Sequence, residues 1–354
     1  MTLIFAAYMA KQLHNKYNRK ELKKLYASQV EDRTVVSFYK YIKIDQPQLF
    51  RNQLYQWFDA LEVKGRIYVA YEGINAQISL PTPRWDEFKS LIDSIESLRG
   101  IRLNVAVEHD AKSFFALIIK VRDKIVADGI EDPDFDVTKS GVHLDAANFN
   151  RLASQSDTVI VDMRNHYESE IGHFKKAITP EVVTFRESLP LVAEALADKK
   201  DQPIIMYCTG GIRCEKASAY LKHHGFNEVY QLDGGIIKYA HDVEYLGLPN
   251  LFIGKNFVFD ERLGERISED VIAHCHQCGA PSDDHVNCAN DACHILFIQC
   301  SSCGEQFDHC CSQKCADFIR LPQEEQAAKR KTETFNGSKF SKGRYKASNK
   351  DLVI

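Results

Sequence analysis

One stretch of the chain, residues 203–220, places a cysteine between a buried strand and a helix. It reads Pro-Ile-Ile-Met-Tyr-Cys-Thr-Gly-Gly-Ile-Arg-Cys-Glu-Lys-Ala-Ser-Ala-Tyr. The apolar run 204–207 is typical of a buried parallel strand, and it stops at Cys208. Two glycines follow, and a helical pattern begins at Cys214. A parallel strand that continues directly into a loop and a helix predicts an α/β domain with this loop at the carboxyl edge of its sheet.

The loop after this strand has the features of an anion-binding cradle. Glycine allows a tight turn, and the N-terminus of the next helix adds positive potential. The backbone amides that can point inward belong to Thr209, Gly210, Gly211 and Ile212. Such a site favours thiolate over thiol, so we expect the pKa of Cys208 to lie well below its free value of about 8.5. Arg213 would be a second anchor for the anion.

Two other interpretations of the loop stay open at this point. Cys208 is also a candidate for a buried structural cysteine, the common state of an intracellular thiol. Phosphatase loops hold a thiolate beneath an arginine too, but they read C-x5-R, whereas four residues separate Cys208 from Arg213 here. Cys214 either packs in the helix or traps an oxidised Cys208 as a disulfide. An activated Cys208 fits best, because the strand end, the glycines and Arg213 coincide.

Residues 32–127 show a βαββαβ order of elements before this domain. Apolar positions alternate in strand-like segments and recur at helical spacing in two others. We expect strands at 34–42, 66–71, 74–80 and 101–107 and helices at 49–61 and 85–95. Glu72-Gly73 is a hairpin signal between the second and third strands. The order predicts a ferredoxin-like or acylphosphatase-like α+β domain.

Residues 128–141 are acidic and rich in turn formers, which predicts a linker. Strands and helices then alternate over 142–250, which predicts a parallel sheet covered by helices on both faces. We expect helices at 145–152, 189–197 and 236–245 and further strands at 158–162 and 227–232. Asp162 and Arg164 lie at the end of one of these strands, and we interpret them as an ion pair that braces the site.

Flanking segments carry a family resemblance. Val159-Ile-Val-Asp-Met-Arg164 is similar to the D-x-R strand end of rhodanese domains, Gly172-His-Phe-Lys-Lys-Ala-Ile178 to their G-H-I-x-G-A-I stretch, and Leu232-Asp-Gly-Gly-Ile236 to their L-x-G-G-I. The Cys208 loop resembles the rhodanese active-site loop. The loop sequence Cys-Thr-Gly-Gly-Ile-Arg-Cys-Glu-Lys also points to a smaller family within this group. It resembles the loop of bacterial oxygen-dependent tRNA uridine hydroxylases, which make 5-hydroxyuridine at the wobble position. In the rhodanese pattern, a histidine such as His173 mainly packs and hydrogen-bonds.

The resemblance continues into the first domain through Val69-Ala-Tyr-Glu-Gly-Ile-Asn75 and Lys120-Val-Arg-Asp-Lys-Ile-Val126. The family usually continues the hairpin with Gly-Thr, whereas Ala76-Gln77 follows here, so the turn after Asn75 is expected to differ. The resemblance implies a tRNA-binding role for 32–127, tRNA as partner and molecular oxygen as co-substrate. The sequence shows no flavin or nicotinamide fingerprint, so no nucleotide cofactor is evident. Nor does it single out a 2-His-1-carboxylate iron site.

Nine of the eleven cysteines crowd into a third region, 251–320. Their paired spacing, two to four residues apart, suits tetrahedral zinc in two four-thiolate sites with one thiol left over. The candidate ligands are Cys275, Cys278, Cys288, Cys293, Cys300, Cys303, Cys310, Cys311 and Cys315. Whether the pairs combine sequentially or interleave stays open, as do histidine ligands, a metal-free reduced segment and a redox-sensing cluster. We expect a structural zinc module.

Composition limits the partners. The net charge is −4 and the pI about 6.4, so an RNA surface must be a local patch. Lys120, Arg122 and Lys124 would form one cationic row on an extended strand, with a solvated strand face as the alternative. A basic tail at 321–354 is expected to be disordered, as a solvated end or an RNA anchor. The extension 1–31 contains an expected helix at 19–26 and no identifiable chemistry.

Thiol-rich composition without a disulfide framework indicates a reducing compartment, and we expect the cytoplasm. No apolar run reaches membrane length, so no membrane contact is expected, and no stable protein partner is evident. Three functions remain: a tRNA uridine hydroxylase, a sulfurtransferase that carries a persulfide on Cys208, and a noncatalytic binding module. We favour the hydroxylase, an oxidoreductase, because the sulfurtransferase needs only the central domain and an inert scaffold does not need Cys208 with Arg213.

Overall fold

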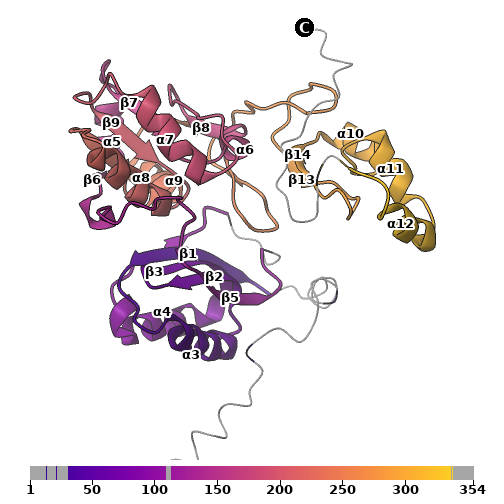
Figure 1. The fold of residues 1–354 in the computed structure, drawn as a ribbon, viewed down its shortest axis with the longest axis horizontal. Coiled ribbons are helices and arrows are strands. Elements are labelled where there is room, and N and C mark those ends of the chain that lie inside the picture. The colour runs from indigo at the N-terminus through magenta and orange to yellow at the C-terminus, as the bar shows by residue number, and fades with distance from the viewer. Residues whose placement is uncertain (1–12, 14–20, 22–30, 109–112, 336, 338–354) are drawn as a thin grey trace, which may run out of the picture.

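The computed structural model describes residues 13, 21, 31–108, 113–335 and 337. Three parts follow one another along the chain, and Figure 1 shows the first lying against the second, with the third at the end of the molecule. The helix expected at 19–26 lies outside the described residues apart from residue 21, as does most of the 1–31 extension.

The first part is a five-stranded sheet covered on one face by two helices (Figure 1). Its elements are β1 (Arg33–Tyr41), α3 (Pro47–Ala60), β2 (Lys64–Ala70), β3 (Gly73–Pro81), α4 (Trp85–Ser94), β4 (Asn104–Val105) and β5 (Leu117–Val121). The strand order is β4-β1-β3-β2-β5, and β5 runs parallel to β2. The expected βαββαβ order is confirmed, but the strand expected at 101–107 is only two residues long. Strand β5, which contains Lys120, adds an edge to the sheet next to β2.

Alternation along β1 sets the relation between the first two parts. Val36 and Phe38 point into the core with α3 and α4, and both are 1 % exposed. Tyr39 and Tyr41 therefore point to the other face of the sheet, where the second part lies. The face that the helices leave uncovered is thus an interdomain surface.

The second part is a parallel sheet with helices on both faces, as expected. Its elements are β6 (Val142–Leu144), α5 (Ala146–Ala153), β7 (Val159–Asp162), α6 (His166–Ser169), β8 (Gly172–Phe174), α7 (Phe185–Ala195), β9 (Ile204–Tyr207), α8 (Ile212–His223), β10 (Val229–Leu232) and α9 (Gly235–Leu246). The strand order is β6-β10-β9-β7, with every pair parallel. Two separate apolar clusters fill the two sides of this sheet. Helix α7 begins earlier than expected, because Thr184 and Glu187 form a capping box at its start.

The third part begins with strands that pair onto the second. Strand β11 (Phe252–Asn256) lies between β8 and β12 (Glu265–Arg266), so this segment is tied to the second domain by main-chain hydrogen bonds. The cysteine-rich module follows, with β13 (His285–Asn287), β14 (Leu296–Ile298), α10 (Ser301–Gln306), α11 (Gln313–Ile319) and α12 (Gln323–Lys329). Its core is made largely of cysteine side chains.

The tail differs in part from expectation. Helix α12 occupies the start of the segment expected to be disordered, with Glu324 and Glu325 at its positive N-terminal end. Most of the basic stretch beyond it, residues 336 and 338–354, lies outside the described residues. None of the helices in the described part of the chain has the length and apolar character needed to cross a lipid bilayer.

Candidate active site

Cys208 lies directly after β9 with its side chain fully buried. Its sulfur accepts a hydrogen bond from the Gly211 amide at 3.2 Å. Gly211 has a φ of 101°, and a Cβ at this position would lie 2.7 Å from the Tyr39 hydroxyl oxygen. Both the backbone conformation and the close approach of Tyr39 therefore require glycine here. The predicted strand-loop-helix is confirmed.

The electrostatics of the loop favour the Cys208 thiolate. Burial alone would raise the pKa of this thiol. The hydrogen bond with Cys214, the charge of Arg213 and the amides of Arg213 and Gly211 outweigh burial and bring the pKa down to about 6. Burial and the neighbouring Cys208 raise the pKa of Cys214 well above its ordinary value, so Cys214 keeps its proton. The two thiols therefore divide into a thiolate and a hydrogen-bond donor.

Arg213 has a partner that the sequence analysis missed. Its guanidinium forms two hydrogen bonds with the Glu168 carboxylate, at 2.7 and 2.8 Å, and a longer one with the Thr209 hydroxyl at 3.4 Å. Glu168 is fully buried and also accepts the Asn165 amide at the start of α6. The spacing Asn165-x-x-Glu168 is a visible capping signal, but a local signal does not reveal a partner 45 residues away.

Asp162 and Arg164 form the predicted ion pair. The Arg164 guanidinium contacts both Asp162 oxygens, at 2.6 to 3.1 Å, and both side chains are fully buried. Arg164 also donates to the Gly172 carbonyl at 2.5 Å and to Asn256 at 3.4 Å. The pair thus connects the end of β7 to β8 and β11 by hydrogen bonds, and it stabilises the strand ends next to the Cys208 loop. His173 contacts the neighbouring Phe174 carbonyl at 3.0 Å.

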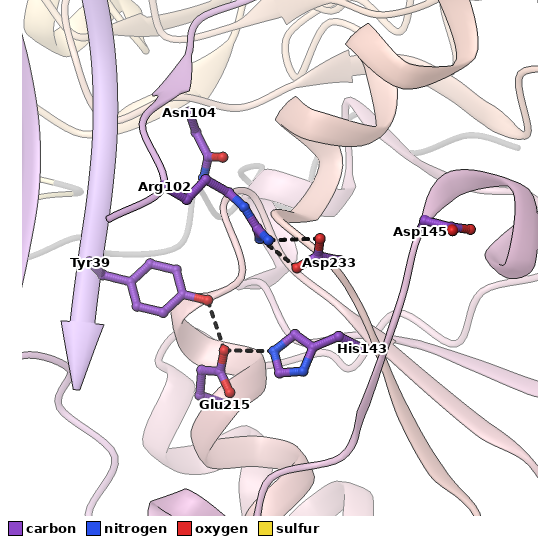
Figure 2. A pocket seen from close by; sticks show the side chains of 7 residues that line it. All are labelled: Tyr39, Arg102, Asn104, His143, Asp145, Glu215 and Asp233. Atoms are coloured by element: carbon purple, nitrogen blue, oxygen red, sulfur yellow. Dashed lines mark hydrogen bonds and ion pairs between the residues drawn. The ribbon is translucent and has the colours of Figure 1, made fainter. Parts of the chain in front are cut away.

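The first domain reaches the catalytic loop with side chains from β1 and β4. The Tyr39 hydroxyl donates to Glu215 at 2.9 Å, and His143 contacts the same carboxylate at 2.9 Å (Figure 2). The Tyr41 hydroxyl donates to the Ile212 carbonyl at 3.2 Å, and the Asn104 amide to the Gly210 carbonyl at 3.3 Å.

A second group of contacts fixes the hairpin between β2 and β3. Lys216 is 2 % exposed and lies between the carboxylates of Glu72, at 2.7 Å, and Asp128. Glu72 also accepts the Ile125 amide at 2.7 Å, and Asn75 donates to the Ile125 carbonyl at 3.2 Å. The hairpin that resembles the hydroxylase family is therefore bonded directly to the helix that begins after Cys208.

A cavity of about 740 Å³ opens between the domains. Cys208, Thr209, Gly210, Ile212 and Arg213 line it from the loop. Aromatic and polar side chains from the other parts of the chain complete the wall, including Tyr39, Tyr68, Asn104, Phe114, Phe259, Arg66, Arg186 and Arg262. Aromatic faces with a few hydrogen-bonding groups suit a planar base. Because Cys208 has no exposed surface, a base that reaches its sulfur must displace part of this wall.

The predicted cationic row does not form on one strand face. Strand β5 ends at Val121, so only Lys120 lies within it. The Lys124 ammonium is bound to Asp128 at 2.6 Å, inside the segment assigned to the linker. The guanidinium of Arg122 lies 5.8 Å from the centre of the Tyr68 ring. The three residues therefore occupy different environments.

The cysteines form two groups by interleaving their pairs. Cys275, Cys278, Cys300 and Cys303 make one, and Cys288, Cys293, Cys311 and Cys315 the other, with the sulfurs of each group within 4.8 Å of one another. Tetrahedral zinc with Zn–S bonds of about 2.3 Å separates sulfurs by about 3.8 Å. The Cys278–Cys300, Cys293–Cys311 and Cys311–Cys315 distances are 3.6, 3.7 and 3.8 Å. The residues thus fit two metal ions, and Cys310, one of the nine predicted candidates, lies outside both groups.

Comparison with known proteins agrees with this architecture. Family models match at 33–125 (UPF0176 acylphosphatase like domain), 145–242 (Rhodanese-like domain) and 253–316 (Rhodanase C-terminal). The predicted acylphosphatase-like and rhodanese-like folds are therefore confirmed.

Curated relatives match nearly the whole chain. A protein of Photorhabdus laumondii is 55% identical over 336 residues, which cover 94% of this chain and 95% of that protein. One of Pectobacterium carotovorum is 56% identical over 317 residues, or 89% of each chain, and one of Yersinia pestis is 56% identical over 319 residues, or 90% of each. Each of the three is named tRNA uridine(34) hydroxylase. With identity above half over nearly its full length, this chain belongs to the tRNA uridine(34) hydroxylase family.

Proposed function

We propose that this protein hydroxylates uridine 34 of tRNA at C5, with Cys208 as a covalent nucleophile and molecular oxygen as co-substrate. The observation that carries the proposal is the Cys208 thiol, whose pKa of about 6 keeps it ionised at neutral pH in the wall of the interdomain cavity. Family membership supplies the substrate and the position.

Uracil is electrophilic at C6, which is where a thiolate adds. The Cys208 sulfur supplies an electron pair for the S–C6 bond, and the C5–C6 pair moves towards C5 and the C4 carbonyl oxygen. Electron-rich C5 then captures one oxygen atom. Loss of the C5 hydrogen as a proton re-forms the double bond and releases Cys208. Overall, one oxygen atom of dioxygen is inserted at C5, and the other leaves as water after it takes two electrons and two protons from a reductant.

The charge of the loop fits a neutral base. Because Glu168 neutralises Arg213, the loop presents no large excess of positive charge to a dianion such as thiosulfate. Family membership also does not favour a sulfurtransferase. Arg213 acts on Cys208 mainly by lowering its pKa, and the loop amides hold the anion. Cys214 contributes a hydrogen bond, and Asp162 with Arg164 keeps the strand ends in place.

For tRNA binding we propose cations around the cavity together with Lys120, Arg122 and the basic tail. Arg66 and Arg186 are exposed residues in the cavity wall, where phosphates beside an extruded base would pass. Lys124 remains a weaker candidate, because RNA would have to compete with Asp128 for its ammonium. We propose 32–127 as the tRNA-binding domain, 142–250 as the catalytic domain and 251–320 as a structural module with two zinc ions. The reduced thiols and the tRNA substrate support a cytoplasmic enzyme.

Nucleoside mass spectrometry tests the proposal. In a strain that lacks the gene, tRNA should lack 5-hydroxyuridine at position 34, the wild-type gene should restore it, and Cys208→Ser should not. Cys310→Ser is a matched control, because Cys310 is a buried cysteine outside the cavity and outside both metal groups. Restoration by Cys208→Ser would refute a covalent role for this thiol.

A further inference from the structure

The first domain presents two polar side chains to the loop that follows Cys208. Ser37 on β1 and Asn104 on β4 are direct cross-strand neighbours, so their side chains project from the same face of the sheet. Both residues line the cavity that contains Cys208. A Cβ at Gly210 would lie 3.7 Å from the Asn104 Nδ2 atom and 3.8 Å from the Ser37 Oγ atom. The two side chains therefore lie against the catalytic loop, and the proposed role of Cys208 uses neither of them.

One hydrogen bond fixes the orientation of the Asn104 amide. Its Nδ2 atom donates to the Gly210 carbonyl oxygen at 3.3 Å. A carbonyl oxygen only accepts, so the nitrogen end of the amide must be the end that faces Gly210. Because the amide group is planar, the position of the Oδ1 atom is then set as well. Asn104 is only 7 % exposed, so its neighbours hinder rotation of the side chain.

The remaining edge of this amide is not used within the part of the chain that the structure describes. There, neither the Oδ1 atom nor the second N–H of Nδ2 has a hydrogen-bond partner. Asn104 also borders the polar pocket of Figure 2, but the charged side chains of that pocket form ion pairs with one another, Arg102 with Asp233 and His143 with Glu215. A buried amide normally forms its hydrogen bonds. The free edge of Asn104 is thus available to a ligand in the cavity beside the catalytic thiol.

An acceptor next to a donor matches the edge of uracil and not that of cytosine. In uracil N3 carries a hydrogen and O4 accepts, whereas in cytosine N3 accepts and the amino group at C4 donates. Since Gly210 fixes the amide, Asn104 cannot exchange its oxygen and nitrogen to suit cytosine. Cytosine would therefore place acceptor against acceptor and donor against donor, and would leave buried polar groups unsatisfied.

We propose that Asn104 determines the specificity of the site for uracil, with Oδ1 accepting from N3–H and Nδ2 donating to O4. This role rests on the proposed function, because addition of Cys208 is what brings uracil into the cavity. C6 and N3 occupy opposite corners of the ring, so a base whose C6 meets the Cys208 sulfur presents N3 and O4 to the facing wall, of which the first domain forms a part. The donor at O4 also stabilises the negative charge that develops there as the thiolate adds.

Asn104→Asp tests the role by changing one contact for each base. The oxygen that replaces Nδ2 donates its single hydrogen to the Gly210 carbonyl and then presents a lone pair to the base. Uracil loses the contact at O4, and cytosine gains one at its amino group. We compare tRNAs with 5-fluorouridine or 5-fluorocytidine at position 34, and mass spectrometry measures the rate at which each forms an adduct with Cys208. The ratio of the cytidine rate to the uridine rate should rise at least about tenfold above that of wild type.

Asn148→Asp is the matched control, because it makes the same chemical change at an exposed position of α5 and should keep the wild-type ratio. Asn104→Leu, which removes both the donor and the acceptor, should lose most of the preference for 5-fluorouridine. A ratio in Asn104→Asp within about twofold of wild type would overturn the inference, and so would an equal loss of both rates. If Asn104→Asp fails to fold, Asn104→Leu decides, and a retained preference for 5-fluorouridine would refute the assignment. The proposed function fails separately, if wild-type protein forms no adduct with either tRNA.

Discussion

The Lys216 ammonium, one turn into the helix after Cys208, lies 2.7 Å from the carboxylate of Glu72 in the hairpin of the first domain. The two residues are 144 positions apart in the sequence. Their ion pair joins the domain proposed to bind tRNA to the helix whose N-terminus faces the catalytic thiol, so hairpin and catalytic loop are held in a fixed relation.

Replacing Lys216 by Met should destabilise the protein and weaken domain docking. Asp128, 1 % exposed at its side chain, would lose one of its two ammonium partners and keep Lys124. We expect a loss of about 3 kcal/mol in the free energy of unfolding, the lower end for one-sided loss of a buried pair. Urea unfolding measures this, with the exposed Lys222→Met on the same helix as control. Equal stability of the two variants would contradict a structural role for the pair.

Replacing Glu168 by Gln should lower the pKa of Cys208 further below about 6. The substitution removes the negative charge that neutralises Arg213, so the guanidinium acts more strongly on the thiolate, by about one pKa unit. The pH dependence of Cys208 alkylation by iodoacetamide reports this value. Glu170→Gln, whose native carboxylate contacts His276, is the control and should leave it unchanged. A higher pKa in Glu168→Gln would show that Glu168 supports the thiolate by another route.

The pH dependence of the reaction should follow the thiolate. The folded pKa of about 6 lies well below that of a free cysteine thiol, so Cys208 is protonated only in more acidic solution. We expect kcat/KM to fall tenfold for each pH unit well below 6 and to become independent of the Cys208 titration above about 7. Arg213→Met should move this acidic limb to higher pH, because it removes a charge that stabilises the thiolate. If the acidic limb of the profile stayed at the same pH in Arg213→Met, the titrating group would be one other than Cys208.

The two adjacent cysteines Cys310 and Cys311 should differ sharply in metal binding. Only Cys311 belongs to a four-sulfur group. Elemental analysis of freshly purified, reduced protein should give about two zinc ions for wild type and for Cys310→Ala, and about one for Cys311→Ala. Chelation should unfold the module, because its core is built mainly of these cysteines. Equal metal content in the two variants would refute the interleaved assignment.

Local sequence patterns were sufficient to predict much of the fold but only part of the candidate active site. The apolar run before Cys208 and the glycines after it were sufficient to predict the strand, the loop and the start of the helix, because those elements form from residues that are neighbours in the sequence. The Tyr39–Glu215 hydrogen bond spans 176 positions and arises only when two domains dock. The Cys208 thiolate was thus predictable, whereas the tyrosine beside it was not.

The wrong prediction and the question that the sequence left open have physical causes of the same kind. The prediction of a strand through Lys124 did not consider Asp128, four residues later. The Asp128 carboxylate forms an ion pair with the Lys124 ammonium. The spacing of the cysteines predicted four-thiolate sites, but the sequence has no signal for which pairs interleave, since that depends on how β13 and β14 pair.

The most direct test of the account uses tRNA that contains 5-fluorouridine at position 34, incubated with the wild-type protein in air with a reductant. Fluorine replaces the hydrogen whose removal accompanies release of Cys208, so the S–C6 bond should persist. Mass spectrometry of the digested complex should find position 34 attached to the peptide containing Cys208. Absence of this adduct, with an added sulfur atom on Cys208 and turnover of thiosulfate, would contradict the account and assign the thiol to sulfur transfer.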